Sequence, residues 1–598
     1  MAKRWWMLLG VAGLGLALFV APRGPAQADA PAVAQAYFGM QAIPKFDERL
    51  GHGAWTGSRD RGLAMHRDLG VQLSREGYIW LHDEPEQGRH PNQGDFDDAI
   101  ARCAEAGIAI QLMITDTPYW ASSAPLKDPS RPDTFRHAPP RNLYASIFDD
   151  GTDVPGPGKR LNPEQYWGCM LARVASRYKG KVKYYQVWNE PDFPKGVQEA
   201  APHDLERSFT GSVQEYVRML SIAHTVLKWQ DPAARIATGG LGYADYLQAM
   251  IDHGAGAVFD ALDFHAYGDP GSDGALRAFL AVSSKMRRVL RHAGLDKALI
   301  CSETGFPASQ PAHQADYIPK LYATGLALGL EGIIYYSNTN PSWRQMGLVD
   351  WRTMQQRTAG YWAYKTAATA LSGMRFAGKL QLTPELVGYR FVAPEGAREV
   401  RVLWAPFREA TAAITYHPPG RWQAVGPDGR ARRLSPGEAL RLSATPVLLD
   451  SDLARRYEPA RPNPPRYAGR IPFREALAAA SEAGGFHEPE LAVDGDPDTE
   501  WVSGPLPEPS LTLALEGSHP LKGVRLKTGP MEGASLAIAV SEDGDRYRTL
   551  VSGLNFEDWG LHAVALPAPT RARWVRFTWS FPPGQAPRPV RAFAIELE

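Results

Sequence analysis

From Ala36 to Leu371 the sequence repeats one pattern, a short apolar run of strand composition followed by a longer segment of helical periodicity. Strands are expected at 37–40, 70–76, 108–114, 183–190, 235–240, 259–267, 298–303 and 332–337. Helices are expected at 95–106, 163–179, 204–230, 244–253, 274–293, 312–328 and 358–371. Because such alternation is typical of parallel sheets with crossover helices, the pattern predicts an α/β fold, and the eight units fit a (β/α)₈ TIM barrel.

Two of the expected strands end on a glutamate. The fourth closes on Asn189-Glu190-Pro191 and the seventh on Glu303-Thr304-Gly305, so that Pro or Gly follows each carboxylate and stops the ladder. In a (β/α)₈ barrel the catalytic groups lie at the C-terminal ends of the strands. One glutamate at a strand end is more often structural, but two of them predict a carboxylate pair that acts on a glycosidic bond.

After Gly373 the sequence changes to short strand-like runs separated by turn residues, which is typical of β-sandwiches. These runs are expected at 386–392, 399–405, 411–416, 421–425 and 439–442. We therefore divide the chain into a signal peptide at 1–30, a barrel at 31–372, an accessory β-sandwich at 373–455, a Pro-rich linker at 456–470 and a second all-β domain at 471–598.

The N-terminus predicts export. Lys3 and Arg4 precede an apolar run at 5–20, and small residues at 26–30 offer cleavage sites, which is the arrangement of a secretory signal peptide. A secreted or periplasmic protein is therefore expected. An uncleaved membrane anchor is the alternative, although the apolar run is short for a membrane span and no later segment is apolar enough for one.

The charge balance and the cysteine content bear on which partners and which disulfides to expect. The formal net charge is +0, from 65 basic and 65 acidic residues, so nothing indicates a nucleic-acid partner. Three cysteines, Cys103, Cys169 and Cys301, are too few for a disulfide scaffold. Cys103 and Cys169 lie in neighbouring helical segments and could pair, whereas Cys301 is expected to be a buried small hydrophobe.

The strand-end motifs resemble those of clan A retaining glycoside hydrolases, closest to family 39, which includes β-xylosidases, α-L-iduronidases and exopolysaccharide hydrolases. The motifs that carry the resemblance are Thr117-Pro118-Tyr119-Trp120-Ala121, Trp188-Asn189-Glu190-Pro191, His265-Ala266-Tyr267, Ser302-Glu303-Thr304-Gly305 and Gly347-Leu348-Val349-Asp350. The resemblance implies that Glu190 is the general acid/base and Glu303 the nucleophile. No cofactor is expected for this reaction.

The same resemblance implies substrate-binding roles for other residues. Asn189 would bind the sugar 2-hydroxyl, His265 would line the subsite, and Tyr267 and Arg75 would hold Glu303 ionised. From the residues alone, Arg75 could instead form a structural ion pair and His265 could be a core histidine.

Aromatic residues near the strand ends are further candidates for sugar binding. Trp120 begins a long loop, 117–158, that could form a wall of the substrate cleft. Related enzymes place a Trp at the end of strand eight, where this chain has Tyr335-Tyr336-Ser337 and then Trp343. Either a Tyr or Trp343 replaces that platform, or the sugar differs.

The last domain resembles a discoidin-like (coagulation factor 5/8 type C) β-sandwich, as in family 32 carbohydrate-binding modules. The motifs that carry this resemblance are 492–501, 541–544, 574–577 and 594–597. Asp494, Asp496, Thr499 and Glu596 are candidate ligands for a structural Ca²⁺, because this ion prefers clustered oxygens. A turn that uses Asp and Gly for their backbone preferences is the alternative.

These features together predict a retaining glycoside hydrolase that cleaves a polysaccharide, such as a bacterial exopolysaccharide. An exo-acting β-glycosidase such as a β-xylosidase is one alternative, and a non-catalytic polysaccharide-binding protein is another. A transglycosylase would use the same two glutamates. The sugar, the linkage, the endo or exo mode and the oligomeric state are not encoded in these motifs.

Overall fold

The computed structural model describes most of the chain after residue 36. The described residues are 37–47, 52–54, 58–124, 134–193, 208–268, 274–337, 346–349, 357–382, 386–405, 414–463, 471, 473–478, 489–493, 501–531, 533–558, 560–592 and 594–598. Trp343 and the expected signal peptide, on which the prediction of export depends, lie outside these residues.

Eight parallel strands form a closed barrel, so the predicted fold class is confirmed. These strands are β1 (Phe38–Gln41), β4 (Leu73–Ile79), β5 (Ala109–Thr115), β6 (Tyr184–Val187), β7 (Ile236–Ala237), β8 (Ala261–His265), β9 (Ala298–Thr304) and β10 (Gly332–Tyr335). They close in the order β1-β10-β9-β8-β7-β6-β5-β4. A short hairpin of β2 (Lys45–Asp47) and β3 (His52–Ala54) follows β1.

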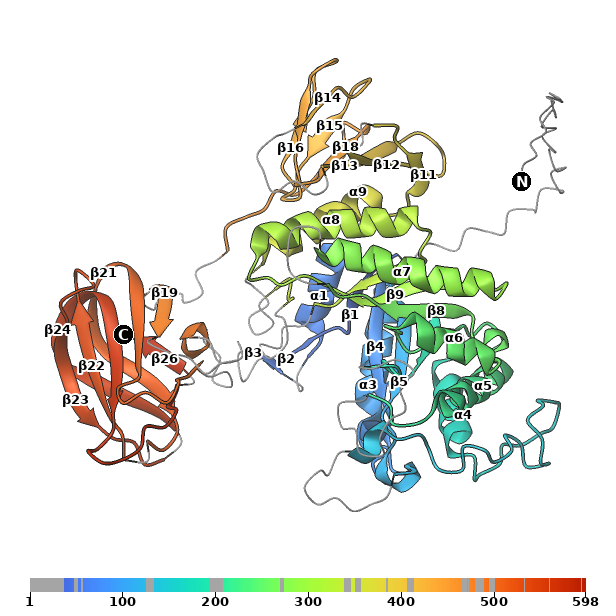
Figure 1. Cartoon of the computed structure of the whole chain (residues 1–598), viewed down its shortest axis with the longest axis horizontal. Helices are drawn as coiled ribbons and strands as arrows, with labels where there is room; N and C mark the ends of the chain where they lie inside the picture. The colour runs from blue at the N-terminus through green and yellow to red at the C-terminus, as the bar shows by residue number, and fades with distance from the viewer. Residues whose placement is uncertain are drawn as a thin grey trace, which may run out of the picture. The chain divides into compact units, whose positions relative to one another are not determined.

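Helices lie outside the strands of the barrel (Figure 1). They are α1 (Asp60–Leu69), α2 (Trp80–Asp83), α3 (Gln93–Glu105), α4 (Tyr166–Tyr178), α5 (Val213–Gln230), α6 (Ala244–Asp252), α7 (Gly274–His292), α8 (Pro311–Ala327) and α9 (Ala359–Leu371). The predicted helices are all present, but α5 begins at 213 rather than 204, because Ser212 and Glu215 form a capping box there. Helices α1 and α2 were not predicted.

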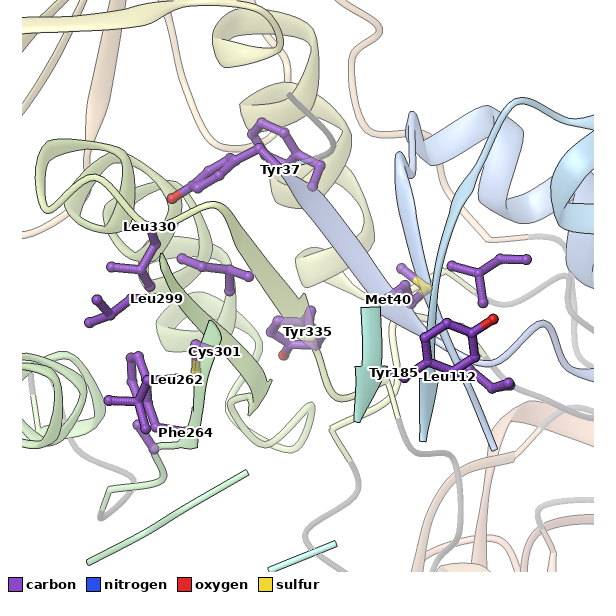
Figure 2. Close-up of a cluster of buried hydrophobic side chains, with 14 of the residues drawn as sticks. Tyr37, Met40, Leu112, Tyr185, Leu262, Phe264, Leu299, Cys301, Leu330 and Tyr335 are labelled. Atoms are coloured by element: carbon purple, nitrogen blue, oxygen red, sulfur yellow. The ribbon is translucent and has the colours of Figure 1, made fainter. Parts of the chain in front are cut away.

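Residues of the barrel strands alternate between two buried environments. Outward side chains such as Leu112, Tyr185 and Phe264 belong to the large apolar core between strands and helices, and Figure 2 shows them with neighbours from several strands. Inward side chains form small apolar layers that include Tyr184 and Ile300. This alternation is the period of two that strand geometry imposes.

The segment between β5 and α4 contains only short 3₁₀ turns among its described residues, η1 (Tyr119–Ala121) and η2 (Thr134–His137). It is tied down at several points; for example, the Thr117 N–H donates to the Arg136 carbonyl at 3.0 Å.

Cys169 on α4 and Cys103 on α3 are both free, so the suggested pairing between them is wrong. Cys301 is buried and free, as expected.

A six-stranded antiparallel sheet and a two-stranded one follow the barrel. The six strands are β11 (Arg375–Lys379), β12 (Val387–Val392), β13 (Glu399–Trp404), β18 (Val447–Asp450), β15 (Gln423–Val425) and β16 (Ala431–Arg433). The pair is β14 (Ile414–Tyr416) with β17 (Leu440–Leu442). Tyr389, Phe391 and Val400 belong to the same apolar core as the barrel. The chain after β18 still contacts α9, since Lys365 pairs with Glu458.

The last domain has a core of its own, which includes Trp501, Phe577 and Trp579. Its main sheet has the order β19 (Phe473–Ala478), β21 (Ser510–Thr528), β24 (Gly560–Ser580), β22 (Ser535–Ser541) and β23 (Arg548–Leu554). Strand β26 (Ala594–Leu597) pairs with β21, β20 (Trp501–Val502) pairs with β25 (Arg591–Ala592), and η4 (Pro489–Ala492) lies between β19 and β20 in the chain. Within the part of the chain that the structure describes, none of the helices has the length and apolar character that crossing a membrane requires.

Candidate active site

The first glutamate leaves the barrel through a sharp backbone turn after β6. The strand ends at Val187, and both Trp188 and Glu190 then have positive φ angles, 72° and 48°. Such angles are uncommon for residues other than glycine and mark a locally constrained backbone. The Glu190 N–H donates to the Gly239 carbonyl at 2.5 Å, so the segment after β7 holds the turn in place. The turn places Glu190 at the C-terminal end of the barrel strands.

The second glutamate, Glu303, lies at the end of β9 and is held by two donors. Arg75 Nη1 donates to its Oε1 at 2.6 Å, and the Tyr267 hydroxyl donates to its Oε2 at 3.0 Å. Burial alone would raise the pKa of Glu303, but the positive charges of His265 and Arg75 and these hydrogen bonds hold it below its ordinary value. Glu303 is therefore kept as a carboxylate.

A histidine on β8 joins the two glutamates. His265 Nδ1 lies 2.7 Å from Glu190 Oε1 and 3.7 Å from Glu303 Oε2, and its Nε2 lies 3.0 Å from the Ser302 hydroxyl. Burial lowers the pKa of His265, but the nearby charges of Glu303 and Glu190 outweigh burial and raise it. The ring has room only because residue 240 is glycine, since a Cβ there would lie 2.1 Å from Nε2.

The two carboxylates are close together. One carboxylate oxygen from each glutamate and a ring nitrogen of His265 all lie within 4.8 Å of one another. Among the residues that the structure describes, this is the one group of three or more His, Cys, Asp or Glu side chains close enough to share a metal ion. Both oxygens of Glu303 already accept hydrogen bonds, one of them from a guanidinium, so the site fits proton transfer better than a divalent cation.

Arg75 is itself fixed by a buried polar layer. Its Nη2 donates to Asn189 Oδ1 at 2.6 Å and its Nε donates to Gln186 Oε1 at 2.8 Å. Gln111 Nε2 donates both to Gln186 Oε1 at 2.9 Å and to Asp263 Oδ2 at 2.6 Å. Arg75 is thus a bridge between Glu303, Asn189 and three fully buried side chains below them.

Asp263 ends this layer on β8. Its Oδ1 accepts the Ser302 backbone N–H at 3.0 Å, next to the hydroxyl that contacts His265. Burial raises the pKa of Asp263 to about 6, although His265, Arg75 and its own hydrogen bonds act in the opposite direction. The layer therefore links the surroundings of both glutamates through one buried carboxyl group.

Most sequence-predicted side chains are brought together here. Glu190, Glu303, Arg75, Tyr267 and His265 form one connected network, and Asn189 joins it through its contact with Arg75.

The aromatic candidates have different positions. Trp120 packs against Trp80 and Tyr166 with ring centroids 5.7 and 5.3 Å away, and its indole N–H donates to the Glu84 carbonyl at 2.9 Å. No described contact joins Trp120 to either glutamate. Just after β10, Tyr336 packs edge-on against Tyr267 with ring centroids 6.3 Å apart, so a tyrosine lies beside the site at the end of the eighth barrel strand.

Contact between Ser302 and His265 was not predicted from the sequence, and neither were the roles of Gln111, Gln186 and Asp263. A usable signal was present, because each of the last three is a polar residue at an inward position of an otherwise apolar strand. In the last domain, Glu596 on β26 is opposite Arg525 on β21, while the other three candidate calcium ligands lie outside the described residues.

Comparison with known proteins finds one matching family model and several similar solved structures. Residues 476–580 match the family model of the F5/8 type C domain, which confirms the class expected for the last domain. A family 39 glycoside hydrolase from the gut symbiont Bacteroides cellulosilyticus WH2 is 16% identical with a TM-score of 0.48, over 70% of this chain and 81% of that chain. A GH30 endoxylanase from Clostridium papyrosolvens C71 is 13% identical with a TM-score of 0.45, over 70% of this chain and 96% of that chain.

CpGH89CBM32-5 from Clostridium perfringens, in complex with GalNAc-β-1,3-galactose, is 23% identical with a TM-score of 0.18, over 21% of this chain and 93% of that chain. No curated protein sequence matches the chain. One of these solved structures is thus of a family 39 glycoside hydrolase, the family named for the strand-end motifs. Evidence for an activity of this chain comes from the side chains of the site itself.

Proposed function

We propose that this protein is a retaining glycoside hydrolase that cleaves a polysaccharide by double displacement. The observation that carries the proposal is the approach of one Glu190 and one Glu303 carboxylate oxygen to within 4.8 Å. Retaining glycosidases have their two carboxyl groups about 5–5.5 Å apart, whereas inverting enzymes leave about 6.5–9.5 Å for a water molecule. An approach of one oxygen pair to within 4.8 Å agrees with the closer spacing, and it supports direct attack by one glutamate on the sugar.

The surroundings of the two glutamates support different roles. Glu303 is kept ionised by Arg75, His265 and Tyr267, which suits a nucleophile. Glu190 is more exposed, with 23% of its side chain accessible against 9% for Glu303, which suits a group that exchanges protons with substrate and water. Because His265 contacts Oε1 of Glu190, the other carboxyl oxygen is the one that carries the proton toward the substrate.

The reaction then has two steps. Glu190 protonates the glycosidic oxygen while a Glu303 oxygen attacks the anomeric carbon, so the C–O bond to the leaving group breaks and a glycosyl ester forms. Glu190, now a carboxylate, takes a proton from water, which attacks the anomeric carbon and releases Glu303. Asn189, fixed by Arg75, supplies the contact to the sugar 2-hydroxyl.

The match to the F5/8 type C domain supports a polymeric substrate, because a separate sugar-binding domain raises the effective concentration of sites along a chain. The N-terminal residues, which lie outside the described part of the structure, support export as a secreted or periplasmic enzyme. A calcium ion held by Asp494, Asp496, Thr499 and Glu596 is part of the same proposal for the last domain.

The test of the reaction is a screen of polysaccharides and glycosyl fluorides, followed by ¹H NMR of the first product that appears. A retaining enzyme gives a product with the anomeric configuration of its substrate before mutarotation equalises the anomers. First-formed product of inverted configuration would rule out direct attack by Glu303.

The role of Glu190 is tested with the Glu190→Gln variant. A dinitrophenyl glycoside needs little protonation, so its glycosyl-enzyme should still form and then accumulate, because the second step lacks its base. Azide needs no base and should release a glycosyl azide of retained configuration. If azide restored no turnover, Glu190 would not be the acid/base.

A further inference from the structure

Two exposed aromatic side chains lie on loops next to Glu190. Phe193 is 46% exposed and Tyr243 is 38% exposed, although large aromatic side chains of the barrel are mostly buried. Phe193 closes the turn that begins at Glu190, since its N–H donates to the Glu190 carbonyl at 3.0 Å. Exposed aromatic rings beside a catalytic centre are typical of binding surfaces.

A buried carboxylate holds the two loops together. Asp192 is 1% exposed, and its Oδ2 accepts the backbone N–H groups of Gly242 and Tyr243 at 2.9 and 2.8 Å. The backbones that carry Phe193 and Tyr243 are therefore neighbours, because each ring is at most one residue from this contact. A second link is the hydrogen bond from the Glu190 N–H to the Gly239 carbonyl. Hydrogen bonds thus join the backbone segments that carry Phe193 and Tyr243 to each other beside Glu190.

Electrostatics also place Tyr243 near the acid/base. Burial raises the pKa of the Tyr243 hydroxyl, and the negative charges of Asp192, Asp245 and Glu190 raise it further. The hydroxyl is therefore within electrostatic reach of the Glu190 carboxylate.

The chemistry of the reaction determines which part of the substrate lies beside Glu190. The acid/base must touch the glycosidic oxygen, so the leaving group extends from Glu190 and away from Glu303. We propose that Phe193 and Tyr243 form the leaving-group subsite and bind the apolar faces of one or two pyranose rings. This inference rests on the proposed glycosidase function, and it gives the enzyme affinity for sugar on the reducing side of the cleaved bond.

The experiment compares two kinds of substrate for Phe193→Ala, Tyr243→Ala and Tyr243→Phe. A glycosyl fluoride places no sugar in the leaving-group subsite, whereas a tetrasaccharide does. Both kinds of substrate are prepared from glucose, galactose, mannose, xylose and glucuronic acid. With the sugar that the wild type cleaves, each Ala variant should lose about tenfold in kcat/KM on the tetrasaccharide. The same variants should keep their kcat/KM on the fluoride, and Tyr243→Phe should keep both.

Phe376→Ala is the matched control, since Phe376 is 37% exposed on β11 of the accessory sandwich. Its kcat/KM should equal that of the wild type on both the fluoride and the tetrasaccharide. Equal losses on the fluoride and the tetrasaccharide would overturn the inference, because the rings would then act on the reacting sugar or on the fold rather than on the leaving group. A tetrasaccharide loss accompanied by a shift in the basic limb of the pH–rate profile would also overturn it, because the rings would then support Glu190 rather than bind sugar. Unchanged activity of both Ala variants on the tetrasaccharide would also overturn it. A wild type that releases no product from any polysaccharide or glycosyl fluoride of the screen would refute the proposed function, and the subsite with it.

Discussion

Substitution of Asp263 by Asn separates the electrostatic cost of the buried layer from its hydrogen bonds. Asp263 is fully buried, and burial raises its pKa to about 6. An unperturbed aspartate titrates near 3.9, and each pKa unit corresponds to about 1.4 kcal/mol. Ionisation of Asp263 in the folded protein therefore costs about 3 kcal/mol of stability.

The sign of the pH dependence follows from the raised pKa. The folded state holds its proton up to a higher pH than the unfolded state does, so the cost is absent below about pH 4 and complete above about pH 6. The amide of the Asp263→Asn variant has no such cost at any pH. It lacks one acceptor, however, because Asp263 accepts from both the Ser302 N–H and Gln111 Nε2. One buried donor is left unmatched, at a cost of about 1–3 kcal/mol.

The Asp263→Asn variant should therefore be less stable than wild type at pH 4.5 and equal or more stable at pH 7.5. About 2 kcal/mol of the ionisation cost develops between pH 4.5 and pH 7.5. For a barrel of this size it corresponds to a change of about 3 °C in the difference between the two Tm values. Thermal unfolding followed by circular dichroism at several pH values measures it. Asp296→Asn, at an exposed aspartate, is the control and should show no such trend. A Tm difference that is constant between pH 4.5 and 7.5 would refute the reasoning.

Three further outcomes are expected. A chain that ends at Asn463 should cleave glycosyl fluorides like the whole protein and show a raised KM on polysaccharide only, because the last domain has a separate core; equal losses on both would contradict a targeting role. Tyr267→Phe should lower kcat by about 10- to 100-fold and move the acid limb of the pH–rate profile upward, since the pKa of Glu303 loses a donor that lowers it. An unmoved limb would argue against Glu303 as the titrating group. Arg75→Lys keeps the positive charge, but a lysine cannot reach the three oxygens that Arg75 contacts, so kcat/KM should fall about 100-fold. The acid limb of the pH–rate profile should stay in place, and comparison of the variant and wild-type profiles would show it.

The barrel was predictable because its signals are local. Apolar runs of strand length alternate with helical periodicity, and Pro191 and Gly305 mark the ends of the strands that carry the two glutamates. Helix α1 was missed, because polar and charged side chains outnumber the apolar ones over its ten residues. This helix packs closely against the loop after β1, because a Cβ at Gly62 would clash with Pro44. Such a tertiary contact has no sequence signature.

The candidate site was predictable in its members and not in its connections. The strand-end motifs indicated Glu190, Glu303 and Tyr267, because these residues lie near one end of the barrel whatever the details of packing. That Gln111 and Gln186 connect Arg75 to Asp263 depends on the register between β4, β5 and β6. Register is set by long-range pairing, which one sequence does not reveal.

The most direct test of the central claim is identification of the residue that becomes covalently linked to sugar. A 2-deoxy-2-fluoro glycosyl fluoride of the cleaved sugar slows formation of the glycosyl-enzyme and slows its hydrolysis still more, so the glycosyl-enzyme accumulates. The labelled protein can then be digested with protease, and mass spectrometry identifies the labelled residue. The structure predicts a label on Glu303, the carboxylate that Arg75 and Tyr267 hold ionised. A label on Glu190, or an active enzyme that is never labelled, would contradict it.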